Sequence, residues 1–464
     1  MFDDGIFRNA GGWRMKNRKK LNFFDILCIG IGGAIGAGIF VLMGYGIAYT
    51  GRSVSIALIL GSIVMLLAYM YNVFLVSMFP FKGGAYSQMA LLFTPTLTGV
   101  NAIFLLLVGC SLSIYSTGIV SYAAAIFPGV AAFSKFSSVA ILTLFFAATV
   151  RGSKFLAMVQ NIMVLILLAS IIVFIIMGLG RVRGGFWSGS DFFSSGIPGF
   201  FSAVALMGFA CQGATGGIAL TADTNKPTRT IPLAILGTTA IVAVLYFFMG
   251  VVASGVLPLE QVTGRDLSAV ARELFPNWAY IVFILGGAVL ALATSLVAAI
   301  AALGYPISKI AEDGWLPKIF AKKTRSGYPW ATQLAFYIIS LIPILAGVSF
   351  SSIVSLVMIP TMLLAAYCNL ACIGIPAKYP QQWRKSIFHM PMPLFATVMS
   401  LSAAADLFVA CYDFITLKSV EMAEVIAAFL ACVVLAILRI KTKAVNVDRL
   451  LEARRTVAEE AVNA

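Results

Sequence analysis

Long apolar runs alternate with short polar junctions along most of this chain of 464 residues. A helix that crosses a lipid bilayer needs about 20 predominantly apolar residues, and twelve runs come close to or exceed that length. They lie at 23–49, 54–79, 97–127, 131–150, 155–180, 197–221, 232–256, 277–303, 332–348, 352–376, 393–412 and 420–438. We therefore predict an all-α membrane protein with twelve transmembrane helices.

The composition favours a membrane protein over every soluble class. Hydrophobic residues make up 61% of the chain and charged residues only 11%, whereas soluble proteins carry about 25% charged residues. This balance excludes a soluble enzyme, a disordered chain and a nucleic-acid-binding module. The net charge of +14 does not point to a nucleic-acid partner, because lysine and arginine cluster in short junctions between apolar runs.

The placement of the basic residues predicts the orientation in the membrane, since cytosolic loops of membrane proteins are enriched in lysine and arginine. With both ends in the cytosol, 25 of the 32 basic residues fall on the cytosolic side and 7 on the other side. We predict cytosolic tails at residues 1–22 and 439–464. The expected location is the plasma membrane, which in a bacterium is the inner membrane.

Ionisable side chains are almost absent from the middle of the predicted spans. Of 18 acidic residues only Asp406 lies well inside a span, and the single histidine, His389, lies in a basic junction. Cys368 and Cys372 are one helical turn apart, but no histidine or acid completes a metal-ligand set. We therefore expect no enzyme activity, no metal and no cofactor. We interpret Asp406 as a buried hydrogen-bonded residue or an oligomer contact rather than a substrate ligand.

Two predicted spans contain glycine-rich runs, GIGGAIGAG at residues 30–38 and GFACQGATGG at residues 208–217. Each glycine costs about 1 kcal/mol in a helix interior relative to alanine. Close packing of helices explains an isolated run of this kind. Two runs, five spans apart, instead favour paired broken helices at equivalent positions of an inverted repeat, which is where transporters of this kind bind substrate.

A broken helix in the middle of a bilayer exposes backbone groups that lipid cannot satisfy. Its freed N–H groups attract a carboxylate, and its freed carbonyl groups attract an ammonium group. A zwitterion uses both kinds of backbone group and needs no charged side chain. The scarcity of buried charge therefore favours a neutral α-amino acid as the substrate.

Four motifs in this order resemble those of the amino acid–polyamine–organocation (APC) superfamily of transporters. The first apolar run contains Ile35-Gly-Ala-Gly-Ile-Phe40, which is similar to the family motif I-G-S-G-I-F with alanine in place of serine. The other three are Pro80-Phe-Lys-Gly-Gly-Ala-Tyr86, Thr224-Asn-Lys-Pro-Thr-Arg-Thr-Ile-Pro232 and Glu312-Asp-Gly-Trp-Leu-Pro317. The resemblance covers essentially the whole chain and identifies it as an amino acid permease.

The resemblance implies a ten-helix core of two inverted five-helix repeats, with alternating access to a central site. The core is residues 23–376, with repeat one at about 23–180 and repeat two at about 197–376, and residues 391–438 form two accessory helices. Backbone N–H groups of Gly36, Ala37 and Gly38 would bind the substrate carboxylate. Carbonyl groups of Ala34 and Ile35, and of residues near 209–212, would bind its amine, with Phe209 as the gate above it. The implied substrate-binding set is Ala34, Ile35, Gly36, Ala37, Gly38, Phe209, Ala210, Cys211, Gln212 and Gly213.

The sequence departs from the family where a coupling cation would bind. By register, the helix 5 position that often carries a lysine is Leu167, and the helix 8 hydroxyl pair falls near Leu303 and Gly304. We therefore predict sodium-independent transport, with exchange as one mode. An amine or polyamine carrier of the same fold is the main alternative, and a transporter-like sensor is a lesser one. The expected partners are a small-molecule substrate and membrane lipid, with a homodimer left open.

Overall fold

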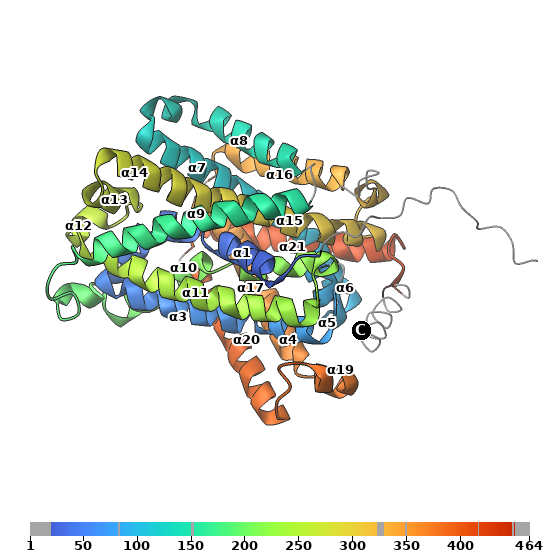
Figure 1. Cartoon of the computed structure of the whole chain (residues 1–464). Helices are drawn as coiled ribbons and strands as arrows, with labels where there is room; N and C mark the ends of the chain where they lie inside the picture. Colours follow the sequence, from blue (N-terminus) through green and yellow to red (C-terminus); the bar gives the residue numbers. More distant parts are fainter. Residues whose placement is uncertain are drawn as a thin grey trace, which may run out of the picture.

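The computed structural model describes residues 20–81, 84–149, 153–322, 329–348, 350–415, 417–447 and 450. These residues form a bundle of helices whose long members run mostly side by side (Figure 1). Within the described part of the chain there is no β-sheet, and a single isolated bridge pairs Leu21 with Thr224. The predicted all-α class is therefore confirmed.

The first repeat of the predicted core contains nine α-helices. They are α1 (Phe23–Ala34), α2 (Ala37–Thr50), α3 (Val54–Ala68), α4 (Met70–Met78), α5 (Gly84–Leu92), α6 (Pro95–Val108), α7 (Leu112–Ile126), α8 (Ser134–Thr149) and α9 (Ser153–Leu179). Short 3₁₀ turns, η1 (Gly51–Ser53), η2 (Gly109–Ser111) and η3 (Pro128–Phe133), join some of them.

The rest of the described chain also consists of helices joined by short turns. Its helices are α10 (Gly196–Ala210), α11 (Pro227–Gly255), α12 (Leu259–Val262), α13 (Ser268–Leu274), α14 (Asn277–Phe283), α15 (Leu290–Glu312), α16 (Trp330–Ala346), α17 (Phe350–Cys372), α18 (Ile375–Lys378), α19 (Pro380–Lys385), α20 (Met392–Ile415) and α21 (Ser419–Lys441). The irregular turns are η4 (Ser190–Phe193), η5 (Ala214–Asp223), η6 (Ile284–Val289) and η7 (Lys318–Ala321), of which η6 is a π-helical turn.

In the described residues, ten helical segments are long and apolar enough to cross a membrane. Two further apolar helices are shorter, α1 with 12 residues and α16 with 17. Both lie in runs that the sequence predicted as spans. The first is short because a break after Ala34 divides the run between α1 and α2. A multi-pass helical membrane protein is confirmed, while the count of twelve spans stays a prediction.

The helices that contain the glycine runs lie in the interior of the bundle. Helix α1 packs against α11, α15 and α9, and α10 packs against α2 and α3. By contrast, the faces of α9 and α21 that point outward carry exposed apolar side chains such as Ile166, Ile176 and Leu430. An apolar outer surface around a small-residue interior is what lipid requires, because bilayer and helix surface are then equally apolar.

The two C-terminal helices pack on the outside of this arrangement. Helix α20 contacts α17 and α3, and α21 contacts α6 and α17. In Figure 1, α20 crosses the direction of α3, α9 and α11 steeply. Their bounds lie close to the predicted accessory segment at residues 391–438.

Candidate substrate site

The first glycine run contains a break in its helix. Helix α1 ends at Ala34, Ile35 is extended (φ −82°, ψ 94°) and Gly36 has φ −148° and ψ −138°. Helix α2 then begins at Ala37. The break therefore separates the two groups of residues that the sequence assigned to the amine and to the carboxylate.

The second glycine run contains a matching break. Helix α10 ends at Ala210, and Cys211, Gln212 and Gly213 connect it to the 3₁₀ helix η5. Gly213 has φ +104°, a backbone conformation that side-chain-bearing residues rarely adopt. The discontinuity of both helices, predicted from glycine content, is present at the predicted residues.

The two breaks lie directly against each other. A Cβ atom added to Gly33 would lie 3.0 Å from the carbonyl oxygen of Gly213. A Cβ atom added to Gly38 would overlap the backbone of Ala210. The glycines thus serve close backbone approach between α1–α2 and α10–η5, in addition to the breaks themselves.

The carbonyl ends of the two broken helices are bound by a tyrosine from α11. The Tyr246 hydroxyl lies 2.9 Å from the carbonyl oxygens of both Ala34 and Ala210, and its side chain is fully buried. A hydroxyl has one proton, so it donates to one of these carbonyls at a time. The other carbonyl is then left available to another donor.

A serine from α15 binds the same stretch of α1 from the other side. Ser295 Oγ lies 2.9 Å from the carbonyl oxygen of Gly32 and 3.4 Å from those of Gly33 and Ile35. Tyr246 and Ser295 together supply donors to carbonyls that the break removes from the regular helix pattern, which the bilayer interior would otherwise leave unpaired.

The amide ends of the breaks differ from the carbonyl ends. The N-cap residues of α2 and η5 are Gly36 and Gly213, which have no side chain that could cap the helix, and no other cap is present among the described residues. The first N–H groups of a helix have no intrahelical partner and carry partial positive charge. The site therefore offers N–H donors for an anion, while hydroxyl groups occupy its carbonyls.

The remaining predicted site residues lie at the α10–η5 break. Gln212 Nε2 donates to the Tyr69 hydroxyl at 2.9 Å and approaches Met358 Sδ at 2.7 Å. Cys211 Sγ lies 3.0 Å from Ser62 Oγ and is buried. Phe209 is partly buried against the core cluster that contains Ile35 and Phe40. The role of Phe209 as a gate stays a prediction, and the side chain of Ala37 lies outside the described residues.

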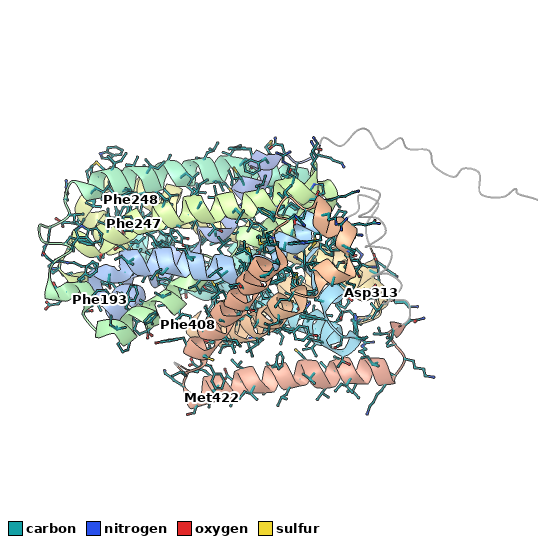
Figure 2. The ribbon with its side chains drawn as sticks, turned by 90° about the horizontal axis from the view of Figure 1, so that it is seen from below. Phe193, Phe247, Phe248, Asp313, Phe408 and Met422 are labelled. Atoms are coloured by element: carbon teal, nitrogen blue, oxygen red, sulfur yellow. The ribbon has the colours of Figure 1, made fainter. Side chains whose placement is uncertain are left out.

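Two ends of the bundle can be told apart by residues labelled in Figure 2, with Asp313 at one end and Phe193 at the other. At the Asp313 end, the Tyr86 hydroxyl donates to Asp313 Oδ2 at 2.8 Å. This bond joins two of the sequence motifs. The start of the chain's described part pairs with a third motif there, because the Leu21 N–H donates to Asp223 and the Asn225 N–H donates to Leu21.

Further contacts hold α2, which follows the first break. The Tyr122 hydroxyl donates to the carbonyl of Phe40 at 2.6 Å, and the Phe40 ring packs against Phe283. The Gly264 N–H donates to the carbonyl of Gly44 at 2.9 Å. Residues from α7, α14 and the segment before α13 therefore fix the position of α2.

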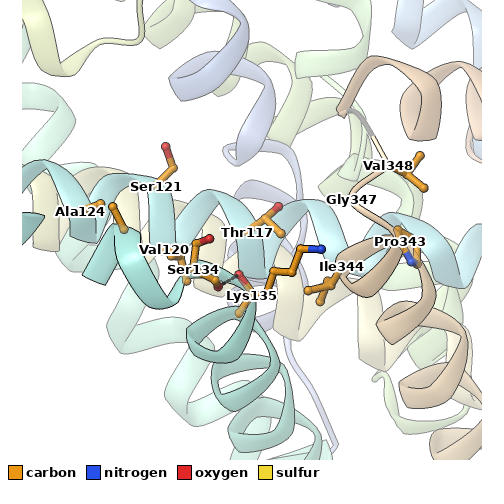
Figure 3. A pocket seen from close by; sticks show the side chains of 12 residues that line it. Thr117, Val120, Ser121, Ala124, Ser134, Lys135, Pro343, Ile344, Gly347 and Val348 are labelled. Carbon is orange, nitrogen blue, oxygen red and sulfur yellow. Dashed lines mark hydrogen bonds between the residues drawn. The ribbon is translucent and has the colours of Figure 1, made fainter. Parts of the chain in front are cut away.

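A cavity of about 470 Å³ lies away from the breaks, between α7, η3–α8 and the end of α16 (Figure 3). Thr117, Ser121 and Ser134 supply its polar lining. Lys135 is already engaged there, since its Nζ donates to the carbonyl of Leu345 at 2.9 Å near the end of α16. None of the residues that line this cavity belongs to the predicted substrate-binding set at the two breaks.

A model of the amino acid permease family matches residues 21–437. The chain belongs to the amino acid permease family. The permease is 26% identical over 406 residues to the methylthioribose transporter of Bacillus subtilis (strain 168), covering 82% of this chain and 86% of that protein. Family and relatives are transporters, so a transporter rather than an enzyme is confirmed.

Two further relatives transport amino acids by name. The permease is 24% identical over 332 residues to the branched-chain amino acid permease BcaP of Bacillus subtilis, covering 66% of this chain and 70% of BcaP. It is 25% identical over 333 residues to cationic amino acid transporter 7, chloroplastic, of Arabidopsis thaliana, covering 66% of this chain. That match spans only 56% of the plant protein.

The structure corrects the register that the sequence suggested for the eighth predicted span, which contains α15. In the fifth predicted span, which is α9, Leu167 is buried in the same apolar cluster as Ala34 and Ile35, so its predicted place beside the break stays a prediction. The hydroxyl of α15 at the break belongs to Ser295, eight residues before the expected Leu303. Leu167 of α9 is uncharged, as the sequence shows, but α15 supplies a hydroxyl oxygen, that of Ser295, at the α1 break.

Sequence reasoning missed Tyr246 and Ser295, although each had a recognisable signal. Tyr246 is a hydroxyl in the middle of an apolar run, where a bilayer leaves it no water as a partner. Thr294 and Ser295 are an adjacent hydroxyl pair within a run of alanine and leucine. A search for hydroxyls at mid-span would have proposed both as partners of broken backbone. Among the described residues, no three His, Cys, Asp or Glu side chains are grouped so as to hold a metal ion.

Proposed function

We propose that this permease is a secondary transporter that moves a neutral, zwitterionic amino acid across the plasma membrane by alternating access, with exchange as one mode. The observation that carries the proposal is the pair of opposed helix breaks with uncapped N-termini at α2 and η5. Their N–H groups suit the carboxylate that every α-amino acid carries.

The amine of the substrate has a defined place in this scheme. The carbonyls of Ala34 and Ala210 share one hydroxyl proton from Tyr246, so an ammonium group, with three protons, satisfies both at once. The ammonium group then replaces the Tyr246 hydroxyl as the hydrogen-bond donor to these carbonyls. No acidic side chain appears among the hydrogen-bond partners described at the two breaks, which favours a neutral amino acid over a cationic one.

The architecture of the proposal is twelve spans with cytosolic tails, in which residues 23–180 and 197–376 form inverted repeats. Support comes from the two breaks, which lie in the first and sixth predicted spans and therefore at equivalent positions. The Tyr86–Asp313 contact and the Tyr122–Phe40 contact would break alternately, so that the substrate site opens to one side of the membrane at a time.

A neutral thioether sugar is a second candidate substrate. One relative is named a methylthioribose transporter, and a specific observation fits such a solute. Tyr246 and Ser295 already donate to carbonyls at the breaks, and a ligand without an amine leaves these hydrogen bonds in place.

Ligand binding to the purified permease distinguishes these candidates, because a ligand stabilises the folded state by mass action. We expect the neutral amino acids, L-leucine among them, to raise the unfolding temperature. Uptake of radiolabelled leucine into proteoliposomes should follow and should persist when choline replaces sodium. A shift with methylthioribose alone, or with L-lysine and putrescine alone, would overturn the proposal, and a strict sodium requirement would overturn its sodium-independent form.

A further inference from the structure

One carboxyl group, Asp406 of α20, lies inside the protein and forms no ion pair with any described residue. Its side chain is completely buried. Helix α20 packs against α17, α3, α10 and α4. The described parts of these four helices contain no Lys, Arg, His, Asp or Glu. Asp406 is therefore a buried acid without an ion-pair partner, and such residues in membrane spans mark functional positions.

The hydrogen bonds of Asp406 satisfy only one of its oxygens. Asn369 Nδ2 donates to Oδ2 at 2.7 Å, whereas Oδ1 has no hydrogen-bond partner among the described residues. Ser402 Oγ, one helical turn earlier on α20, is also buried without a partner. Residues four apart on a helix are neighbours. A proton on Oδ1 would therefore have an acceptor nearby in Ser402 or in a water molecule beside it.

The environment of Asp406 stabilises a neutral carboxyl. A buried carboxylate needs a cation or several donors to offset the loss of hydration, and Asp406 has one amide donor. The titratable groups that face it are Tyr69, Tyr71 and Cys368, none of which supplies positive charge. The other acid of α20, Asp413, lies about two turns further along. The surroundings of Asp406 in this structure therefore match a protonated, uncharged carboxyl group.

Asp406 connects to the substrate site through a chain of side chains. The second predicted span is interrupted at Tyr69, between α3 and α4. Asn369 bridges this interruption, because it accepts from the Tyr71 N–H and donates to the carbonyl of Ala68. The Tyr69 hydroxyl in turn accepts from Gln212 at the α10–η5 break. Hydrogen bonds through Tyr69 and the adjoining backbone of Ala68 therefore join that break to Asn369, the only described donor to Asp406.

We propose that Asp406 is the proton-binding site that couples transport in this permease to the proton gradient. The inference rests on the proposed function. Asp406 takes up one proton from water on one side of the membrane and holds it as a neutral carboxyl in the closed state. When the break moves and water reaches Oδ1, the proton leaves to water on the other side. One positive charge then crosses with each neutral substrate.

The substitution Asp406→Asn tests this role, because asparagine keeps the shape and the acceptor for Asn369 but has no titratable proton. In proteoliposomes with an imposed pH gradient, we expect the wild type to accumulate radiolabelled L-leucine and to acidify the lumen with it. The variant should lose both effects while it still exchanges labelled for unlabelled leucine. The matched control is Asp413→Asn on the same helix, which should behave as the wild type does.

A second measurement reads the proton without any substrate. The infrared spectrum of the purified wild type at neutral pH should contain the C=O stretch of a protonated carboxyl group, shifted in D₂O. The difference spectrum of the wild type minus Asp406→Asn should contain this band, and adding Asp406→Asn to Asp413→Asn should remove the same band. Its absence from the wild type, or gradient-driven accumulation by Asp406→Asn, would overturn the proposal. Failure of the wild type to exchange leucine would instead count against the proposed function, and the infrared band would still test Asp406.

Discussion

At the scale of single residues, the most informative side chain of the site is Tyr246. Its hydroxyl lies equally close to two carbonyl oxygens that come from different broken helices, at 2.9 Å each. It therefore joins the ends of α1 and α10 while it leaves one of the two carbonyls short of a donor. A group placed in this way stabilises the empty site and competes with a substrate amine.

We predict that Tyr246→Phe lowers the stability of the empty permease and increases its stabilisation by neutral amino acids. Two buried carbonyls lose their donor, which costs about 1–3 kcal/mol. A bound ammonium group restores the missing donors, so the ligand-induced rise in unfolding temperature should be larger than in the wild type. Thermal unfolding with and without L-leucine measures both effects.

The control is Tyr122→Phe, which also removes a buried tyrosine hydroxyl bound to a carbonyl, that of Phe40. This variant should be less stable without any gain in the leucine-induced shift. An equal gain in both variants would show that Tyr246 does not compete with the ligand.

At the scale of elements, the contact between α2 and α10 depends on Gly38. A Cβ atom at this position would overlap the Cα, Cβ and N atoms of Ala210, where backbone has no room to move aside. The close approach holds the N-terminus of α2 against the end of α10. This packing is what brings the amide end of one broken helix beside the carbonyl end of the other.

We predict that Gly38→Ala is enough to abolish substrate binding. Forcing apart two packed helices costs about 1–3 kcal/mol or more, and it separates the donors from the acceptors of the site. The test is the loss of the leucine-induced thermal shift and of uptake, in protein that still inserts and purifies as a monodisperse species. Gly38→Leu should have the same effect more strongly.

Gly129→Ala makes the same chemical change where an added Cβ would meet no atom within 4 Å. This control should bind and transport as the wild type does. If Gly38→Ala also bound leucine normally, the assignment of the site to the α2–α10 contact would be wrong.

Some features of these helices could be predicted from the sequence and others could not. The breaks after Ala34 and Ala210 were predictable because glycine content acts locally, through the backbone of the helix that contains it. The register of α15 against α1 was not, since it depends on how the helices rotate about their axes as they pack. Ser295, in place of the expected Leu303, is therefore the α15 residue that lies at the break.

At the scale of the whole molecule, two sets of contacts flank the helix breaks. The Tyr86–Asp313 bond lies at the Asp313 end in Figure 2. The contacts of Tyr122 with Phe40 and of Gly264 with Gly44 hold α2, which follows the first break. A membrane orientation with cytosolic tails places the Asp313 end in the cytosol, together with the basic junctions.

We predict this orientation, since basic residues are retained on the cytosolic side. Reporter fusions to the N-terminus and C-terminus should both be active only if the reporter works in the cytosol. A cysteine introduced at Arg265 should react with an impermeant maleimide in intact cells. A control cysteine at Lys318 should react only after the membrane is opened. The reverse labelling pattern would invert the topology.

The sequence by itself determined the class of the protein, the positions of most spans, the two helix breaks and the family motifs. These features depend on the length and apolarity of local segments and on glycine, and the bilayer enforces them segment by segment. Only the tertiary structure decided the partners of the breaks. It brought Tyr246 from α11 and Ser295 from α15 to orphaned carbonyls, and it linked Asp406 through Asn369 and Tyr69 to Gln212. Those pairings join residues far apart in the chain, and helix packing rather than local pattern brings them within hydrogen-bonding distance.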